Sequence, residues 1–256
     1  MKSRDMSLIS HLEELRYRLI YSILFFILGT CIAFLGRGFF LTIVKEPHMW
    51  AMSKLHIQEA LYVFRYQENF MGQLKLCMVA GAILSFPFLL FHFLKFVGAG
   101  LYDHEKRKLY IFLPFFFFLF VMGVLFGYFL MIPYGLYFLM SFGQDVGLAP
   151  LISFSDYINL FFLLTFVTGI VFELPLLMLF LSRLGLVDLK TFKSKRRYAI
   201  VSAFILGAIF TPPDPVTQIF LAGALIMLYE CGCVLVTCFS KDKSIGSRDD
   251  AHSKKT

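Results

Sequence analysis

The strongest constraint on this sequence is a series of long apolar runs that hold almost no charged residues. A helix needs about 20 predominantly apolar residues to cross the hydrocarbon core of a membrane. Six runs can be placed on that basis, at residues 19–36, 76–94, 109–133, 157–182, 198–211 and 216–238. We therefore predict an all-α membrane protein with six transmembrane helices.

The composition leaves little of the chain for a soluble domain. Of the 256 residues, 59% are hydrophobic and only 16% are charged, whereas soluble domains carry about 25% charged residues. We predict a cytoplasmic amphipathic segment at 1–18, a six-helix transmembrane domain at 19–238 and a disordered cytoplasmic tail at 239–256. This division leaves no room for a catalytic domain outside the membrane.

The fifth and sixth predicted spans are short helices on either side of a proline-rich turn. Pro212 and Pro213 stop the fifth helix, because proline lacks the backbone donor and clashes with the preceding turn. The 14 residues from 198 to 211 reach about 21 Å, against a hydrocarbon core of about 30 Å. The sixth helix resumes at about Val216. In the third span, Pro133 is expected to end the helix.

The distribution of basic residues predicts the orientation. With six crossings both termini share a side, and that side carries 19 of the 24 Lys and Arg residues. The other 5 all lie between the first two spans. Because Lys and Arg concentrate in cytoplasmic segments, both termini are predicted to be cytoplasmic. The N-terminus shows no presequence or cleavable signal, which favours a bacterial plasma membrane, or an organellar membrane if the chain is organelle-encoded.

Several functional classes lack support in the sequence. The net charge of +7 comes from basic residues between the apolar runs, where they act as topology signals and not as a nucleic-acid surface. The five cysteines lack C-x-x-C spacing, so neither a metal site nor a disulfide is predicted. No nucleophile with its base and no phosphate-binding loop is evident. We therefore expect no cofactor and no enzyme activity.

The segment at 7–19 places a carboxylate beside the first span. Ser10 followed by Glu13 forms a capping-box pattern, which predicts a short helix starting there. Glu14 points about 100° further round that helix, with Arg18 as its i,i+4 partner. Two interpretations remain open. Glu14 belongs to an ordinary solvated helix with surface ion pairs, or it recognises a cationic ligand at the membrane surface.

A second acidic site lies in the tight loop between the second and third spans, on the same predicted face. Glu105 follows Asp103 there and precedes three basic residues, which in one interpretation simply neutralise it. In the other interpretation, Glu14 and Glu105 each take one guanidinium group in a bidentate pair, a geometry that suits Arg and not Lys. Two such pairs would select a ligand with paired arginines.

Glu173 is the most anomalous residue, because it lies near the middle of the fourth span. An ionisable group at that depth costs roughly 2.5–3.5 kcal/mol on translocon-insertion scales, so it marks a functional site by default. It is expected to face a polar or hydrated concavity or to be protonated. The alternative is a neutral carboxyl group that is hydrogen-bonded to a neighbouring helix. On the far side, the turn at 211–218 brings Asp214 and Gln218 toward the hairpin of short helices.

Four motifs occur in an order that resembles the TatC family, the multi-span receptor subunit of the twin-arginine protein translocase. They are HLEELRYRL at 11–19, FVGAGLYDHEKR at 96–107, FELP at 172–175 and TPPDPVTQ at 211–218. Each motif alone is weak, but four in order on a chain with six predicted spans are specific. The resemblance covers the chain from Leu8 to about Val236.

The resemblance implies a protein that binds the twin-arginine signal peptides of folded cargo and works with TatA-like and TatB-like single-span partners, driven by the proton-motive force. It also implies self-association in a receptor complex. Carried over by motif, Glu14 and Glu105 would hold the arginines, and Arg16, Phe96 and Leu101 would shape the site. The other positions it implies are Glu173 in the concave face, Asp214 and Gln218 at the outer cap, and Pro47 in the first outer loop. Ala99 stands where the family has proline.

Two further functions were considered. A proton-coupled carrier of small solutes would use Glu173 as a relay, but such carriers are usually built from inverted repeats, and no such symmetry is visible. A purely structural membrane subunit would give no reason for a carboxylate at mid-span. The signal-peptide receptor is therefore the leading hypothesis.

Overall fold

The computed structural model describes residues 8–58, 60–99, 103–144 and 151–240, and for 8–11, 97–99, 103–111, 143–144 and 240 it describes the backbone alone. Within these ranges the regular elements are helices, with one isolated parallel β-bridge between Tyr62 and Ser153. The predicted all-α class is confirmed.

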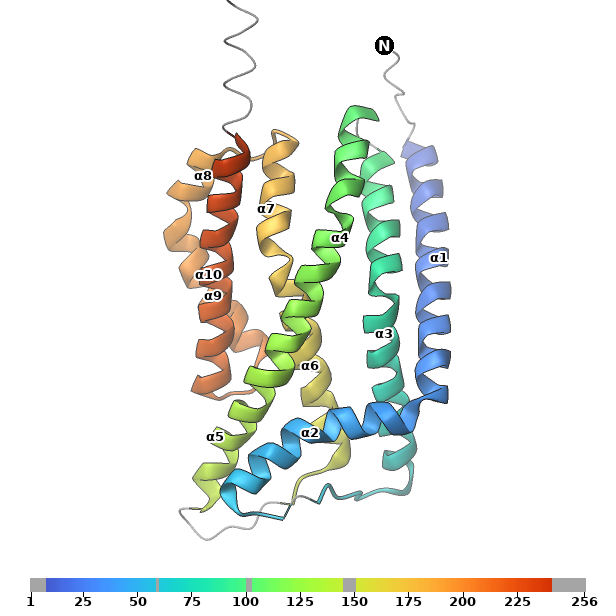
Figure 1. Ribbon diagram of the computed structural model, residues 1–256, viewed down its shortest axis with the longest axis vertical. Coiled ribbons are helices and arrows are strands. Elements are labelled where there is room, and N and C mark those ends of the chain that lie inside the picture. Colours follow the sequence, from blue (N-terminus) through green and yellow to red (C-terminus); the bar gives the residue numbers. More distant parts are fainter. Residues whose placement is uncertain (1–7, 59, 100–102, 145–150, 241–256) are drawn as a thin grey trace, which may run out of the picture.

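The long helices run side by side, and α2 lies across them at one end of the molecule (Figure 1). We call this the α2 end and the opposite one the α8 end. Helix α1 begins, and α10 finishes, at the α8 end. The helices are α1 (Leu8–Leu35), α2 (Arg37–Leu55), α3 (Tyr66–Ala99), α4 (Asp103–Phe126), the π-helix η1 (Gly127–Met131), α5 (Ile132–Gln144), α6 (Phe154–Phe172), α7 (Leu174–Arg183), α8 (Leu189–Ser194), α9 (Arg196–Phe210) and α10 (Pro215–Ser240).

Within the described part of the chain, five helical segments are long and apolar enough to cross a membrane: residues 12–35, 66–96, 112–142, 154–183 and 215–239. They correspond to the first four predicted spans and the sixth. The predicted fifth span is α9, whose 15 residues reach only about 22 Å at 1.5 Å per residue. Its shortness is confirmed, whereas the count of six crossings stays a prediction.

Helix α10 corrects the expectation of a short sixth helix, because it has 26 residues and reaches about 39 Å. It begins at Pro215, where proline is well tolerated because the first residues of a helix have no intrahelical acceptor for their N–H groups. Figure 1 shows that α9 and α10 end at about the level where α2 begins and do not extend beside it. The pair is therefore short only toward the α2 end.

The first helix is continuous across the expected boundary at residue 18. It begins at Leu8, so Ser10 lies inside the first turn and the predicted capping box at Ser10 is wrong. No proline interrupts the sequence before Leu35, and the charged segment and the first span therefore form one rod. Of the predicted tail at 239–256, all but the first two residues lie outside the described part of the chain.

Pro133 does not end the third span, contrary to expectation. Helix α4 passes into the π-helix η1 and then into α5, which contains Pro133 at its second position and continues to Gln144. Proline removes one helical hydrogen bond and crowds the carbonyl four residues before it. The wider π-helical turn directly before α5 provides room for that carbonyl, so the rod continues.

The fourth predicted span is broken at Glu173, between α6 and α7. Pro175 lies at the start of α7 and cannot donate to the carbonyl of Val171. The chain continues nevertheless, because Glu173 N donates to Ile170 O at 3.0 Å and Leu177 N donates to Glu173 O at 2.9 Å. A proline two residues after the carboxylate therefore places Glu173 at a local helix end.

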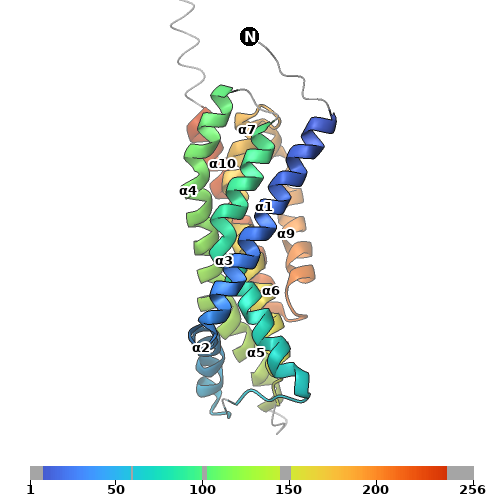
Figure 2. The same ribbon diagram turned by 90° about the vertical axis from the view of Figure 1, so that its right-hand side faces the viewer.

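The first and third helices pack closely along their length, as both views show (Figures 1 and 2). A Cβ atom on Gly29 would lie 2.7 Å from the carbonyl oxygen of Gly81, and one on Gly81 would lie 2.5 Å from Thr30 N. Small residues let two membrane helices approach closely, so this crossing needs glycine on both sides. The second half of α1 is thereby held against α3.

Candidate functional site

Glu14 lies in the second turn of α1 with its carboxylate half-buried. Its Oε1 atom accepts a hydrogen bond from Arg18 Nη2 at 3.0 Å, and the two side chains are 21% and 20% exposed. The i,i+4 pair predicted from the sequence is therefore confirmed. One turn deeper, the Tyr21 ring stacks on His92 of α3 with the centroids 5.5 Å apart, which supports this part of α1.

The structure brings the helix starts that carry the two predicted acidic sites to the same end. Helix α1 begins, α3 ends and α4 begins at the α8 end (Figure 1). Glu105 belongs to the first turn of α4, where only the backbone is described. Arg16 is exposed on α1, Phe96 is partly buried near the end of α3, and Leu101 lies outside the described residues. That Glu14 and Glu105 act together stays a prediction.

Glu173 is a partly buried carboxylate between α6 and α7. Neither of its carboxylate oxygens has a hydrogen-bond partner among the described residues, and both oxygens are inaccessible. The predicted alternative, a carboxyl group hydrogen-bonded to a neighbouring helix, is therefore not found. Buried polar atoms are normally paired, so an unpaired carboxyl group within a candidate membrane span is unusual, and a functional role for Glu173 stays a prediction.

Asp214 and Gln218 hold the turn between α9 and α10 together. Asp214 is 2% exposed, and its Oδ1 accepts from Thr217 N at 2.7 Å while Oδ2 accepts from the Thr217 hydroxyl group. This is the geometry of an N-cap, which satisfies a backbone donor that a helix start leaves unpaired. Gln218 Nε2 donates to Phe204 O of α9 at 3.3 Å. The Asp214 carboxylate is thus engaged within the chain.

Pro47 is buried in the middle of α2. Two tyrosines from neighbouring helices donate hydrogen bonds to backbone carbonyl groups of α2 near it. Because Pro47 has no N–H group, the carbonyl of Ile43 lacks its helical donor. Tyr128 Oη of η1 donates to that carbonyl oxygen at 2.8 Å, and Tyr157 of α6 donates to Val44 O. Pro47 was predicted from the sequence, whereas neither tyrosine was; the only signal of each was a hydroxyl group within an apolar run.

Glu68 organises the α2 end and was not singled out from the sequence. Its Oε2 accepts from Phe64 N at 2.7 Å and from Arg65 N at 3.2 Å, at the start of α3. Its Oε1 accepts from Ser155 N at 3.2 Å and from the Ser153 hydroxyl group. A glutamate three residues after the N-cap position, here Arg65, commonly reaches back in this way, which was the signal available in the sequence.

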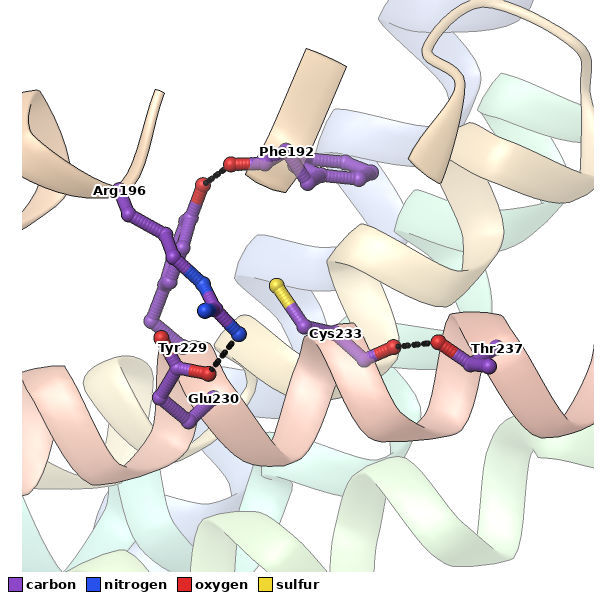
Figure 3. A network of polar contacts seen from close by, with 6 residues as sticks. All are labelled: Phe192, Arg196, Tyr229, Glu230, Cys233 and Thr237. Atoms are coloured by element: carbon purple, nitrogen blue, oxygen red, sulfur yellow. Dashed lines mark hydrogen bonds and ion pairs between the residues drawn. The ribbon is translucent and has the colours of Figure 1, made fainter. Parts of the chain in front are cut away.

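A polar network joins α8, α9 and α10 at the α8 end (Figure 3). Arg196 Nη2 lies 2.6 Å from Glu230 Oε2, and Tyr229 Oη donates to Phe192 O at 2.7 Å. The ion pair connects Arg196, the first residue of α9, with Glu230 of α10, which is the sixth predicted span. Both of its side chains are about half exposed, which limits its contribution to stability.

Comparisons with known proteins agree with this architecture. A family model described as Sec-independent protein translocase protein (TatC) matches residues 10–223. The Sec-independent protein translocase protein TatC of Aquifex aeolicus (strain VF5) is 37% identical over 231 residues, which are 90% of this chain and 94% of that protein. The uncharacterized tatC-like protein ycf43 of Porphyra purpurea is 32% identical over 237 residues, 92% and 90% of the two chains. The crystal structure of the twin arginine translocase receptor TatC matches with a TM-score of 0.77 and 34% identity, over 89% of this chain and 98% of that one.

Proposed function

Because this chain belongs to the TatC family and is thereby a multi-span membrane component of the Sec-independent protein translocase, we propose that it binds twin-arginine signal peptides of folded proteins. The proposed site is the α8 end, which faces the cytoplasm. The observation that carries this proposal is the placement of the starts of α1 and α4, with Glu14 and Glu105, at that one end.

The ion pair of Glu14 with Arg18 suggests how the peptide is captured. The carboxylate already accepts a guanidinium group of its own helix at 3.0 Å, which positions it for the same chemistry with a ligand. An incoming arginine competes with or joins Arg18, and Glu105 takes the second arginine. Arg16, Phe96 and Leu101 shape the site around them. Helix α3 continues to Ala99, the position at which the family motif has proline.

Glu173 is proposed to serve the later passage of the peptide into the membrane. An unpaired carboxyl group at a helix break offers a polar contact to a peptide segment, or to water that enters with it. The protein nucleates a complex with TatA-like and TatB-like single-span partners and further copies of itself, and the proton-motive force drives translocation. Pro47, Asp214 and Gln218 keep the opposite face rigid.

Peptide binding to the purified full-length protein tests the acidic pair. Glu14→Gln and Glu105→Gln should each weaken binding of a twin-arginine peptide by at least about tenfold, since each removes one charge-assisted pair. Glu13→Gln is the matched control, because Glu13 is exposed on the same turn of α1 and faces another direction. Unchanged affinity in both variants, with intact folding, would reject the proposed site.

A transport assay tests Glu173. Glu173→Gln should retain more translocation of a folded cargo than Glu173→Leu, because an amide keeps a polar group at the helix break. If Glu173→Leu transports as well as the wild type, Glu173 has no part in the mechanism. The carrier hypothesis, which the family does not favour, would instead predict that a small solute is taken up through Glu173.

A further inference from the structure

A cavity of about 460 Å³ lies between α1, α3 and α6, away from the proposed peptide site. Its wall on α3 runs from Lys75 to Leu89, which is about 21 Å at 1.5 Å per residue. Apart from Lys75 and Asn159, its lining residues are apolar, with Phe162 and Phe166 contributed by α6. We call it the α3/α6 groove. It is an apolar groove with two polar side chains, Lys75 and Asn159, at one end, which we call its mouth.

The mouth of the α3/α6 groove carries a cation with unused donors. Lys75 Nζ donates to Asn159 Oδ1 at 2.9 Å, and both side chains are exposed at that point. An ammonium group has three N–H donors, so two remain, and the Asn159 amide group offers two more. Among the described residues Lys75 has no carboxylate partner. The mouth is therefore complementary to an anionic group.

The groove also lies at a depth that suits a lipid. Lys75 directly precedes the apolar run of α3 at 76–94, which is about 28 Å long and close to the thickness of the hydrocarbon core. Lys75 is thus the charged residue that bounds this apolar run on the side of the α2 end, where its long side chain can reach toward the headgroups. The apolar wall extends from there toward the middle of the membrane.

We propose that the α3/α6 groove binds an anionic phospholipid from the leaflet at the α2 end. The phosphate group contacts Lys75 and Asn159, and one acyl chain follows the wall past Ala82 to Leu89. A transmembrane helix that presents only apolar side chains would leave the donors of Lys75 and Asn159 without an acceptor, whereas a phosphate group satisfies them. The inference does not depend on signal-peptide binding.

Fluorescence quenching by brominated lipids tests this site in the reconstituted full-length protein. The only tryptophan is replaced by Trp50→Phe, and Phe162→Trp places a reporter in the groove. We expect dibrominated phosphatidylglycerol to bind there about fivefold more tightly than dibrominated phosphatidylcholine, a preference that one exposed ion pair can supply. Lys75→Gln should abolish the preference, whereas Lys54→Gln, at the same end but off the groove, should leave it unchanged.

Two further variants separate the groove from the general membrane surface. A reporter introduced by Ile219→Trp, at a position that is 59% exposed on α10, should show no preference between the two lipids. Ala82→Phe fills the apolar wall without a change of charge and should reduce quenching of the groove reporter by both lipids. The proposal is overturned if Lys75→Gln keeps the preference, if Ala82→Phe has no effect, or if both reporters prefer phosphatidylglycerol equally.

Discussion

The two ends of the molecule use polar groups in opposite ways. At the α2 end and in the nearby α9–α10 turn, Glu68 and Asp214 each accept backbone hydrogen bonds, and two tyrosines satisfy carbonyl groups of α2. At the α8 end the carboxylates of Glu14 and Glu230 each pair with one arginine side chain; the first pair is partly buried and the second is about half exposed. A carboxylate that accepts backbone hydrogen bonds ties segments of the main chain together, whereas an ion pair between two side chains can exchange a partner without disturbing the backbone. The α2 end is therefore expected to be rigid, whereas the α8 end can change its side-chain partners.

The largest expected effect on stability is at Glu68. Glu68→Ala removes the acceptor for three backbone N–H groups and one hydroxyl group and releases the start of α3 from the start of α6. We expect the melting temperature in detergent to fall by several degrees, measured by thermal denaturation. Gln67→Ala, an exposed residue on the same turn, is the control. Equal melting temperatures of the two variants would show that the Glu68 carboxylate does not stabilise the α2 end.

A smaller effect is expected at Asp214. Asp214→Ala removes the cap of α10 and should lower the free energy of unfolding by about 1–2 kcal/mol, the usual contribution of an N-cap side chain. Asp214→Asn caps nearly as well and should be close to the wild type. The measurement is unfolding of the purified protein in mixed detergent. If Asp214→Asn lowers the free energy of unfolding as much as Asp214→Ala does, the negative charge of Asp214 contributes more to stability than its capping hydrogen bond.

The smallest effect is expected at the ion pair of Arg196 and Glu230. Arg196→Gln should change the free energy of unfolding by less than about 1 kcal/mol, because both partners are about half exposed. The difference should shrink further as salt is raised, since salt screens exposed charges. The neighbouring Arg197→Gln serves as the control. A larger loss than in Asp214→Ala would contradict the contrast between the two ends.

Much of the candidate site could be predicted because its signals are local. The Glu14–Arg18 pair follows from helical spacing, Glu173 stands out against an apolar background, and the α9 helix must end at Pro212. Other features involve residues distant in sequence. Tyr128 meets Ile43 across 85 positions, and Tyr157 meets Val44 across 113. A hydroxyl group in an apolar run does not identify its acceptor, so the tyrosines were missed.

The effect of a proline depends in the same way on its surroundings. Pro175 breaks the fourth span, whereas Pro47 and Pro133 lie within helices that continue. At Pro47 a tyrosine replaces the missing donor, and before Pro133 a π-helical turn makes room for the displaced carbonyl. Neither compensation is visible in the sequence around the proline.

The amino-acid sequence by itself determined that this chain is a multi-span helical membrane protein with a short fifth helix and a carboxylate where a membrane span should be apolar. The physical reason is that membrane insertion and helix formation act on contiguous residues. Only the tertiary structure decided which carbonyl groups receive a tyrosine, which carboxylates are saturated, and which lysine stands at the mouth of a groove. Those outcomes depend on pairs of groups that distant segments bring within hydrogen-bonding distance.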